Sequence, residues 1–237
     1  MDTFKFFGRR KGRKIRKAKT SLLERFLPQL TINENSAITP AMFGTFVTDI
    51  CLEIGFGGGE HLAGTAQMYP QTGFIGAEVF QNGIANLLSL LTGIKQNSEI
   101  PEKIDLLPDR VDNIRIFSDD VRKLFSRIPD GFVDKVFLLF PDPWPKKRHA
   151  DRRFVNPANL NELARIIKPG GTLFIATDHP IYKRWVLEQL RHSTVFAWTA
   201  RNSNDWRNPP ADWVPTKYQQ KAIREGRRPV FFEYRRI

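Results

Sequence analysis

Glycines and carboxylates share one short segment that could bind a small ligand. The segment "CLEIGFGGGEHL" places Gly55, Gly57 and Gly59 directly after an apolar run, with Glu53 just before the first glycine. Because glycine has no Cβ, the backbone here can approach a ligand closely. The dinucleotide fingerprint G-x-G-x-x-G would need a glycine where Glu60 stands, and this argues against a nicotinamide cofactor.

Further carboxylates follow the next two strand-like segments. Glu78 comes at the end of "GFIGAEV", and Asp119 and Asp120 end "NIRIFSDD". Acids at the carboxyl ends of parallel strands line the edge where open α/β sheets bind ligands, and an acid after the second strand can accept both ribose hydroxyls. Several acids without a basic residue in the glycine loop favour a ligand with an amine and a cationic centre. S-adenosylmethionine has both.

The stretch "FLLFPDPWPKKRHADRR" places one more carboxylate, Asp142, between two prolines. The prolines restrict the backbone and stiffen the turn. Trp144 can stack on or shield a planar group. A basic run behind the turn would attract phosphates and so bring a nucleic-acid base to the acid. This run consists of Lys146, Lys147, Arg148, Arg152 and Arg153.

Alternating strands and helices must position these residues. Apolar runs predict strands over residues 48–56, 73–79, 113–119, 134–140 and 172–178. The other patterned segments predict helices over residues 21–30, 60–70, 80–95, 120–128 and 179–192, and a helix within 156–171 that has Asn156 as its N-cap and Gly170 beyond its end. This alternation predicts a parallel sheet covered on both faces. Two late segments, 194–200 and 229–237, lack a crossover helix, so we expect an antiparallel hairpin at one edge.

Composition limits the class of protein. The chain has 237 residues, and its formal net charge of +12 favours an anionic partner. The single cysteine, Cys51, excludes an internal disulfide, and no Cys/His cluster has the spacing of metal ligands, so we expect no metal. No apolar run approaches the roughly 20 residues of a membrane span. We therefore expect a soluble, cytoplasmic protein that does not bind membranes.

Five stretches resemble the bacterial tRNA (guanine-N7)-methyltransferases, in order and in spacing. They are "EIGFGGG", "FIGAEV", "DDVRKLF", "LFPDPWPKKRHADRRFV" and "TKYQQKAIREGRRPVFF", and they cover the chain from about residue 48 to its end. The resemblance implies an α/β, seven-stranded, Rossmann-like methyltransferase fold that depends on S-adenosylmethionine. Its sheet would be mostly parallel with an antiparallel C-terminal edge hairpin. We expect residues 21–237 to form a single methyltransferase domain and residues 1–20 a flexible basic arm, which could also order on RNA or DNA phosphates.

The resemblance also implies an activity and a set of site residues. The enzyme would methylate N7 of a guanosine in the tRNA variable loop, position 46, giving 7-methylguanosine. Together with the glycines Gly55 and Gly57, the methyl donor would contact Glu53, Glu78, Asp120 and Asp142. The tRNA guanosine would contact Lys146, Asp178, Thr216, Lys217, Tyr218 and Gln219. The family usually has glutamate where Gln219 stands, so any role that needs a carboxylate there is in doubt.

Guanine N7 carries a lone pair and no proton, so its methylation needs no general base. We therefore expect Asp142 to act through charge and position, and we do not expect His149 or His179 to act as bases. A helix N-cap is the alternative role for Asp178. Three alternatives to this function stay open: an NAD-dependent oxidoreductase, a non-enzymatic RNA-binding module, and an adenine or protein methyltransferase. The oligomeric state is also open.

Overall fold

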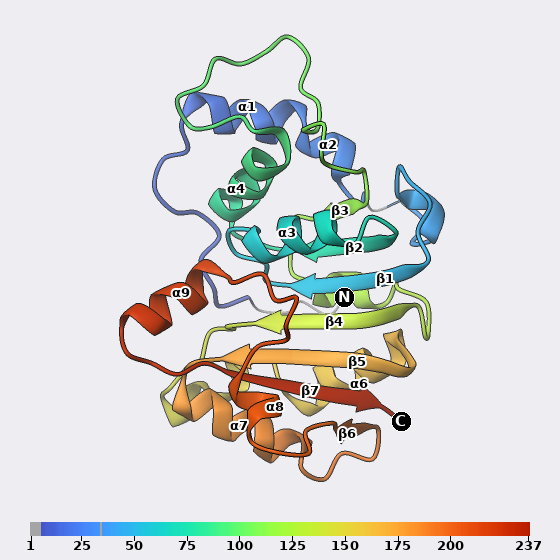
Figure 1. The fold of residues 1–237 in the computed structure, drawn as a ribbon, viewed down its shortest axis with the longest axis vertical. Coiled ribbons are helices and arrows are strands. Elements are labelled where there is room, and N and C mark those ends of the chain that lie inside the picture. The colour runs from blue at the N-terminus through green and yellow to red at the C-terminus, as the bar shows by residue number, and fades with distance from the viewer. Residues whose placement is uncertain (1–5, 34) are drawn as a thin grey trace. The chain divides into compact units, whose positions relative to one another are not determined.

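The computed structural model describes residues 6–33 and 35–237. The chain forms two compact units (Figure 1). The N-terminal unit comprises the described residues of 8–127, and the C-terminal unit comprises residues 128–237 together with Phe6 and Phe7. Residues 1–5 of the predicted arm lie outside the described residues. The division into an arm over 1–20 and one domain over 21–237 stays a prediction.

Three parallel strands of the sheet belong to the N-terminal unit, in the order β3-β2-β1. They are β1 (Asp49–Ile54), β2 (Thr72–Ala77) and β3 (Ile114–Phe117). Leu52, Ile75 and Ile116, one from each strand, are fully buried, because strands covered on both faces exclude water from their middle. The helices of this unit are α1 (Lys17–Arg25), α2 (Leu27–Leu30), η1 (Pro40–Met42), α3 (Glu60–Met68), α4 (Gln81–Thr92) and α5 (Arg122–Phe125).

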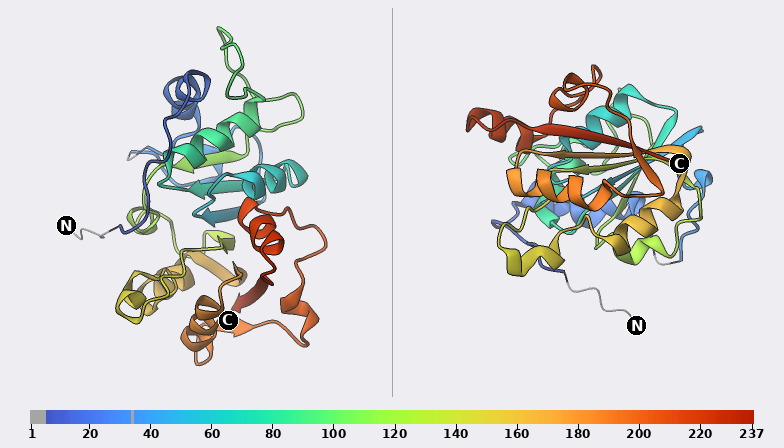
Figure 2. Two further views of the ribbon diagram at one scale, coloured as in Figure 1. Left: turned by 90° about the vertical axis from the view of Figure 1, so that its left-hand side faces the viewer. Right: turned by 90° about the horizontal axis from the view of Figure 1, so that it is seen from below.

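Four further strands of the sheet belong to the C-terminal unit, in the order β4-β5-β7-β6. They are β4 (Val133–Leu139), β5 (Ile167–Thr177), β6 (Phe196–Trp198) and β7 (Val230–Arg236). β4 and β5 are parallel, and β7 runs antiparallel to both β5 and β6. Figure 2 shows helices α6 (Pro157–Ile166) and α7 (Pro180–Leu190) on one face of these strands and α8 (Asn204–Arg207) on the other. The remaining helices are η2 (Lys147–Arg152) and α9 (Lys217–Arg224).

The predicted fold class is confirmed: the sheet has seven strands, is mostly parallel, and ends in an antiparallel C-terminal hairpin. Cys51 is buried, as expected of a core residue. No helix within residues 6–33 and 35–237 is long and apolar enough to cross a membrane.

Several predicted helix boundaries are wrong. The helix predicted over 120–128 is only α5 (Arg122–Phe125). The helix predicted between an N-cap at Asn156 and a stop before Gly170 has this N-cap but ends earlier, at Ile166, and β5 begins at once because Ile167 pairs with Val133 of β4. The residues that follow bulge out before pairing resumes at Thr172, with Gly170 in the left-handed region at φ 80°. The helix predicted over 21–30 begins earlier, at Lys17, and is interrupted after Arg25, where Pro28 opens a new helical turn.

Candidate active site

The glycine loop, residues 55–59, joins β1 to α3 in a conformation that glycine favours. Gly55, Gly57 and Gly59 have φ values of 69°, 57° and 78°. A Cβ on Gly59 would stand 2.7 Å from Leu87 of α4, whereas a Cβ on Gly55 would meet nothing within 4 Å. Gly59 is therefore needed for helix packing, while the backbone at Gly55 faces open space that a ligand can approach.

Glu78 lies directly after β2, as predicted, and both of its carboxylate oxygens accept backbone hydrogen bonds. Gly57 N–H donates to Oε2 over 2.7 Å. The N–H groups of Val79 and Phe80 donate to Oε1 over 2.8 and 2.9 Å. Because Glu78 is buried, these bonds fix the carboxylate and tie the end of β2 to the glycine loop. This structural role did not emerge from the sequence.

Glu53, the candidate on β1, is buried against a histidine that sequence reasoning missed. His61 Nδ1 lies 2.8 Å from Glu53 Oε2, and only 3% and 2% of the two side chains is exposed. His61 is the second residue of α3 and reaches back over the glycine loop to the strand. The position of His61 eight residues after Glu53, across a loop that reverses the chain, was the available signal.

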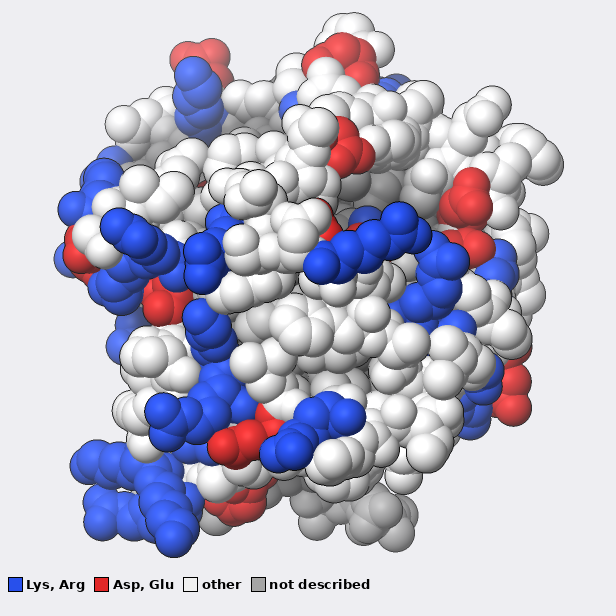
Figure 3. Space-filling view, turned by 60° about the horizontal axis from the view of Figure 1, so that its bottom comes forward, with Lys and Arg blue, Asp and Glu red and all other residues white. Residues whose placement is uncertain are grey.

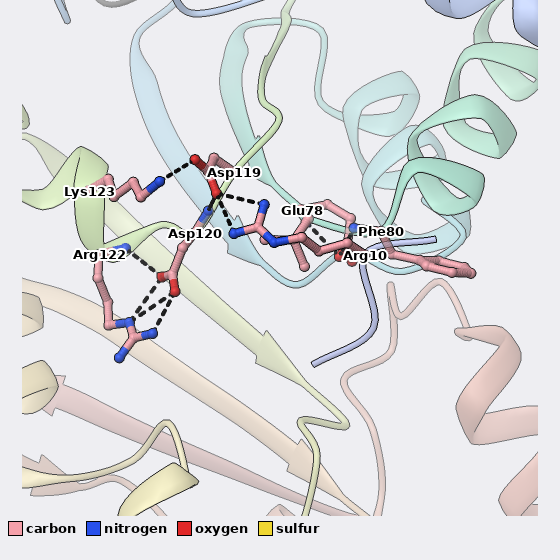
Figure 4. Close-up of polar contacts among 8 residues, drawn as sticks. Arg10, Glu78, Phe80, Asp119, Asp120, Arg122 and Lys123 are labelled. Carbon is pink, nitrogen blue, oxygen red and sulfur yellow. Dashed lines mark hydrogen bonds and ion pairs between the residues drawn. The ribbon is translucent and has the colours of Figure 1, made fainter. Parts of the chain in front are cut away.

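The two acids after β3 are both paired (Figure 4). Asp120 is buried and accepts from the backbone N–H and the guanidinium of Arg122. Asp119 lies 2.5 Å from Lys123 and 3.2 Å from Arg10. Burial acts to raise the pKa of Asp119, but hydrogen bonds from Lys123 and the Asp120 N–H, with the charge of Lys123, hold it below its usual value. Asp119 is therefore charged at neutral pH.

The segment before α1 lies against the start of α4, beside these acids. The carbonyl of Arg10 accepts from Gln81 N–H over 3.0 Å. Gly12 N–H donates to Asn82 Oδ1 over 2.8 Å, and Asn82 Nδ2 donates to the Arg13 carbonyl over 2.7 Å. Part of the predicted basic arm thus belongs to the surroundings of the candidate donor site.

In the C-terminal unit, Asp142 follows β4 in a strained turn, residues 140–145, named the Asp142 turn below. Phe140 and Trp144 have φ values of 51° and 40°, a region that residues with a Cβ rarely adopt. Asp142 is an exposed residue, yet neighbouring protein removes part of the water around its carboxylate, and this desolvation raises its pKa. Trp144 makes an edge-to-face contact with His149 at 5.7 Å.

Basic side chains surround this turn. Lys146, Lys147 and Arg148 are exposed. Desolvation and the charges of Arg152 and Arg148 lower the pKa of His149, which leaves the imidazole neutral at physiological pH. Figure 3 shows one face of the molecule on which Lys and Arg side chains are more prominent than Asp and Glu side chains. Such a surface attracts phosphates.

The other substrate candidates of the C-terminal unit lie after β5 and at the start of α9. Asp178 accepts from Arg227 Nε, and the N-cap of α7 is His179 rather than Asp178. Thr216 is buried and caps α9 by accepting from Gln219 N–H over 3.0 Å. Gln219 is buried, and its Oε1 accepts from Trp213 Nε1 over 2.5 Å.

Within the same helical turn, Lys217 and Tyr218 are exposed. The structure thus joins Thr216 and Gln219 in one cap and leaves the two residues between them open to solvent.

A pocket of about 380 Å³ between α8 and β7 contains none of the predicted site residues. Within the described part of the chain, no group of three or more His, Cys, Asp or Glu side chains could hold a metal ion.

A seven-stranded sheet with carboxylates after its parallel strands defines the class of S-adenosylmethionine-dependent methyltransferase folds. The fold resembles the solved structure of the 16S rRNA methyltransferase KamB, with a TM-score of 0.51 and 13% identity over 80% of this chain and 88% of that one. Residues 48–231 match the family described as "Putative methyltransferase".

Curated relatives identify the particular family. A tRNA (guanine-N(7)-)-methyltransferase from Paramagnetospirillum magneticum is 45% identical over 98% of this chain and 92% of its own length. Those from Rhodospirillum rubrum and Chelativorans sp. are 42% and 41% identical, over 98% and 100% of this chain and 88% and 97% of their own lengths. The chain belongs to the tRNA (guanine-N7)-methyltransferase family, which the five sequence stretches had suggested.

Proposed function

We propose that the protein transfers the methyl group of S-adenosylmethionine to N7 of a guanosine in tRNA, at position 46 of the variable loop, giving 7-methylguanosine. The observation that carries this proposal is the identity of 45% to a tRNA (guanine-N(7)-)-methyltransferase over nearly the whole chain. The reaction takes place in the cytoplasm, where tRNA is found. Residues 21–237 act as one methyltransferase domain.

The donor site is proposed to lie at the carboxyl ends of β1, β2 and β3. The glycine loop offers open backbone at Gly55, and Glu53, Glu78 and Asp120 are held in place around it by hydrogen bonds. Carboxylates suit the amine, the sulfonium and the ribose hydroxyls of S-adenosylmethionine, so the residues present fit this donor. When bound, it supplies an electrophilic methyl group attached to a positively charged sulfur.

The protein's contribution to the chemical step is proposed to be alignment and charge. Guanine N7 attacks in line with the breaking sulfur–carbon bond, and positive charge moves from sulfur to the purine. Since no proton is removed, the side chains need only position the base and stabilise the moving charge. Asp142 has this role, and Asp178 assists it.

The tRNA is proposed to bind the basic surface of the C-terminal unit. Lys146 follows the Asp142 turn directly, and Lys217 and Tyr218 are exposed at the start of α9. Further exposed basic side chains on α9 and after it are Lys221, Arg224, Arg227 and Arg228. Phosphate contacts of this kind position an RNA, whereas contacts to the base select it.

Mapping the methylated atom tests the proposal. Purified protein is incubated with labelled S-adenosylmethionine and unmodified tRNA transcript, and the product nucleoside is identified by mass spectrometry and located along the tRNA. We expect 7-methylguanosine at position 46, and no label in a transcript with adenosine there. Methylated adenosine, or label in protein alone, would assign the enzyme to another methyltransferase class. Reduction of NAD would favour the oxidoreductase.

A further inference from the structure

Arg153 differs from the other members of the basic run that follows Asp142. The sequence groups it with residues expected to bind phosphate, yet only 5% of Arg153 is exposed, whereas Lys147 and Arg148 are exposed. A buried guanidinium is costly unless its donors are satisfied. Its burial therefore indicates that Arg153 contacts other parts of the protein rather than RNA.

The donors of Arg153 are directed at the Asp142 turn. Nε donates to the carbonyls of Pro143 and Trp144 over 3.2 and 3.3 Å, and Nη2 donates to the Trp144 carbonyl over 3.0 Å. These two residues come directly after Asp142. The guanidinium thus binds the backbone that carries the carboxylate, and it does so from within the same unit.

The guanidinium of Arg153 also contacts the ring of a tryptophan. Its central carbon lies 4.6 Å from the ring centre of Trp185 on α7, a favourable cation–π arrangement. Trp185 Nε1 in turn donates to the Val155 carbonyl over 2.6 Å. Arg153 therefore links the Asp142 turn to α7 and to the start of α6.

The turn needs such a link because its backbone is strained. Left-handed φ values at Phe140 and Trp144 are unfavourable for residues that have a Cβ, and they persist only where the surrounding structure holds them. Asp142 lies between these two residues. Without the bonds from Arg153, the turn can relax and move the carboxylate.

We propose that Arg153 is a positioning residue that fixes Asp142 for methyl transfer and does not bind tRNA phosphate. The inference rests on the proposed function, because it assigns Asp142 to the chemical step. Lysine cannot replace arginine here, since an ammonium lacks the planar fork that reaches two carbonyls and stacks on indole.

The test compares Arg153→Lys and Arg153→Gln with the matched control variants Arg148→Lys and Arg148→Gln, from the exposed part of the same run. Single-turnover rates are measured with saturating donor and tRNA, and tRNA affinity is measured across a salt series. Arg153→Lys should lower the rate about tenfold to a hundredfold, as a displaced catalytic group does. Its tRNA affinity should stay within about twofold and keep its salt slope. Arg148→Gln should show the opposite pattern in binding, namely weaker tRNA affinity and a reduced salt slope.

A double variant provides a second readout. If Arg153 acts through Asp142, Arg153→Lys should have little further effect on the rate in an Asp142→Asn background. Arg153→Gln also removes a buried charge, so thermal unfolding of each variant is recorded to separate loss of folding from loss of rate. The conservative Arg153→Lys variant decides the outcome. A folded Arg153→Lys variant with the wild-type rate would overturn the inference, as would a reduced salt slope or additive effects with Asp142→Asn.

The proposed function fails on a different result, namely wild-type protein that forms no 7-methylguanosine. A crystal structure of Arg153→Lys decides the positioning role independently of activity. We expect displacement of the Asp142 turn, and an unmoved turn would overturn the inference.

Discussion

The imidazole of His61 lies 2.8 Å from the carboxylate of Glu53, and both side chains are almost wholly buried. Glu53 belongs to β1 and His61 to α3, so their contact joins the two elements that the glycine loop connects. A buried carboxylate needs a hydrogen-bonding partner, and His61 supplies it. The pair therefore connects the stability of this unit to the shape of the candidate donor site.

Replacing His61 with leucine should weaken both folding and donor binding. The variant leaves the buried carboxylate of Glu53 without the imidazole, which costs about 1–3 kcal/mol of unfolding free energy. His61→Gln retains an N–H donor and should lose less. Urea unfolding and calorimetric titration with S-adenosylmethionine measure the two effects, with the exposed His192→Gln variant as a control. Unchanged stability and affinity in His61→Leu would show that the pair is dispensable.

Glu78→Gln should reduce donor affinity strongly although it changes few atoms. The wild-type oxygens accept from the N–H groups of Gly57, Val79 and Phe80, and an amide must turn its own NH₂ group toward one of these donors. We expect a loss of about 1.5–3 kcal/mol, or roughly 10- to 100-fold in affinity. Calorimetry with S-adenosylmethionine checks this, and the exposed Glu102→Gln variant is the control. A folded Glu78→Gln variant with wild-type affinity contradicts the assignment.

Deleting residues 1–16, up to the start of α1, should weaken tRNA binding and flatten its salt dependence. The same guanosine should still be methylated, because phosphate contacts carry no sequence information directly. Arg10→Ala removes an exposed ion pair with Asp119, which is worth up to about 1 kcal/mol. Filter binding across a salt series, together with mapping of the methylated nucleotide, measures both variants. Methylation at a different nucleotide would refute the prediction.

Asp142→Asn should slow methyl transfer by about a hundredfold, or on the order of 3 kcal/mol in the barrier, because it removes negative charge and keeps the shape. Desolvation raises the pKa of Asp142 above the usual 3.8, so protonation removes its charge at a higher pH than for an ordinary aspartate. The wild-type single-turnover rate should therefore fall on acidification with a midpoint above 3.8.

From about pH 6 to 9 the same rate should be level, because guanine N7 has no proton to lose. A midpoint near the histidine reference value of about 6.5 would reveal a general base instead. Asp142→Asn should abolish the acidic decline. A variant that reacts at the wild-type rate would exclude the electrostatic role.

Trp213→Phe should destabilise the start of α9. The substitution keeps an aromatic ring against Phe174 but removes the N–H that donates to the buried oxygen of Gln219. An unsatisfied buried acceptor costs about 1–3 kcal/mol. Thermal unfolding and the Michaelis constant for tRNA measure the outcome. Trp206→Phe, which keeps a stacked ring against Phe232, is the matched control and should change little.

The strands and the placement of the acids could be predicted from the sequence for a clear physical reason. Buried parallel strands consist of continuous apolar runs, and the residue where such a run ends lies at the carboxyl edge of the sheet. Glu78, Asp120, Asp142 and Asp178 each follow a strand at the place expected.

The pairing of these acids could not be predicted, because it depends on contacts between distant residues. Asp119 and Arg10 are 109 positions apart, and Asp178 and Arg227 are 49 apart. Local patterns also cannot separate a buried arginine from exposed ones within a basic run, so the sequence groups Arg153 with residues that would attract phosphates. The left-handed backbone at Phe140 likewise goes against local preference and is maintained by tertiary contacts.

The position of β7 between β5 and β6 has a consequence for synthesis of the protein on the ribosome. β5 is complete once Thr177 has emerged, but its antiparallel neighbour begins only at Val230. At roughly 5–20 residues per second, the nascent chain exposes one unpaired edge of β5 for on the order of seconds. An apolar open edge is a template for pairing with another chain. During translation, this edge is therefore a site where chaperones can protect the chain against aggregation.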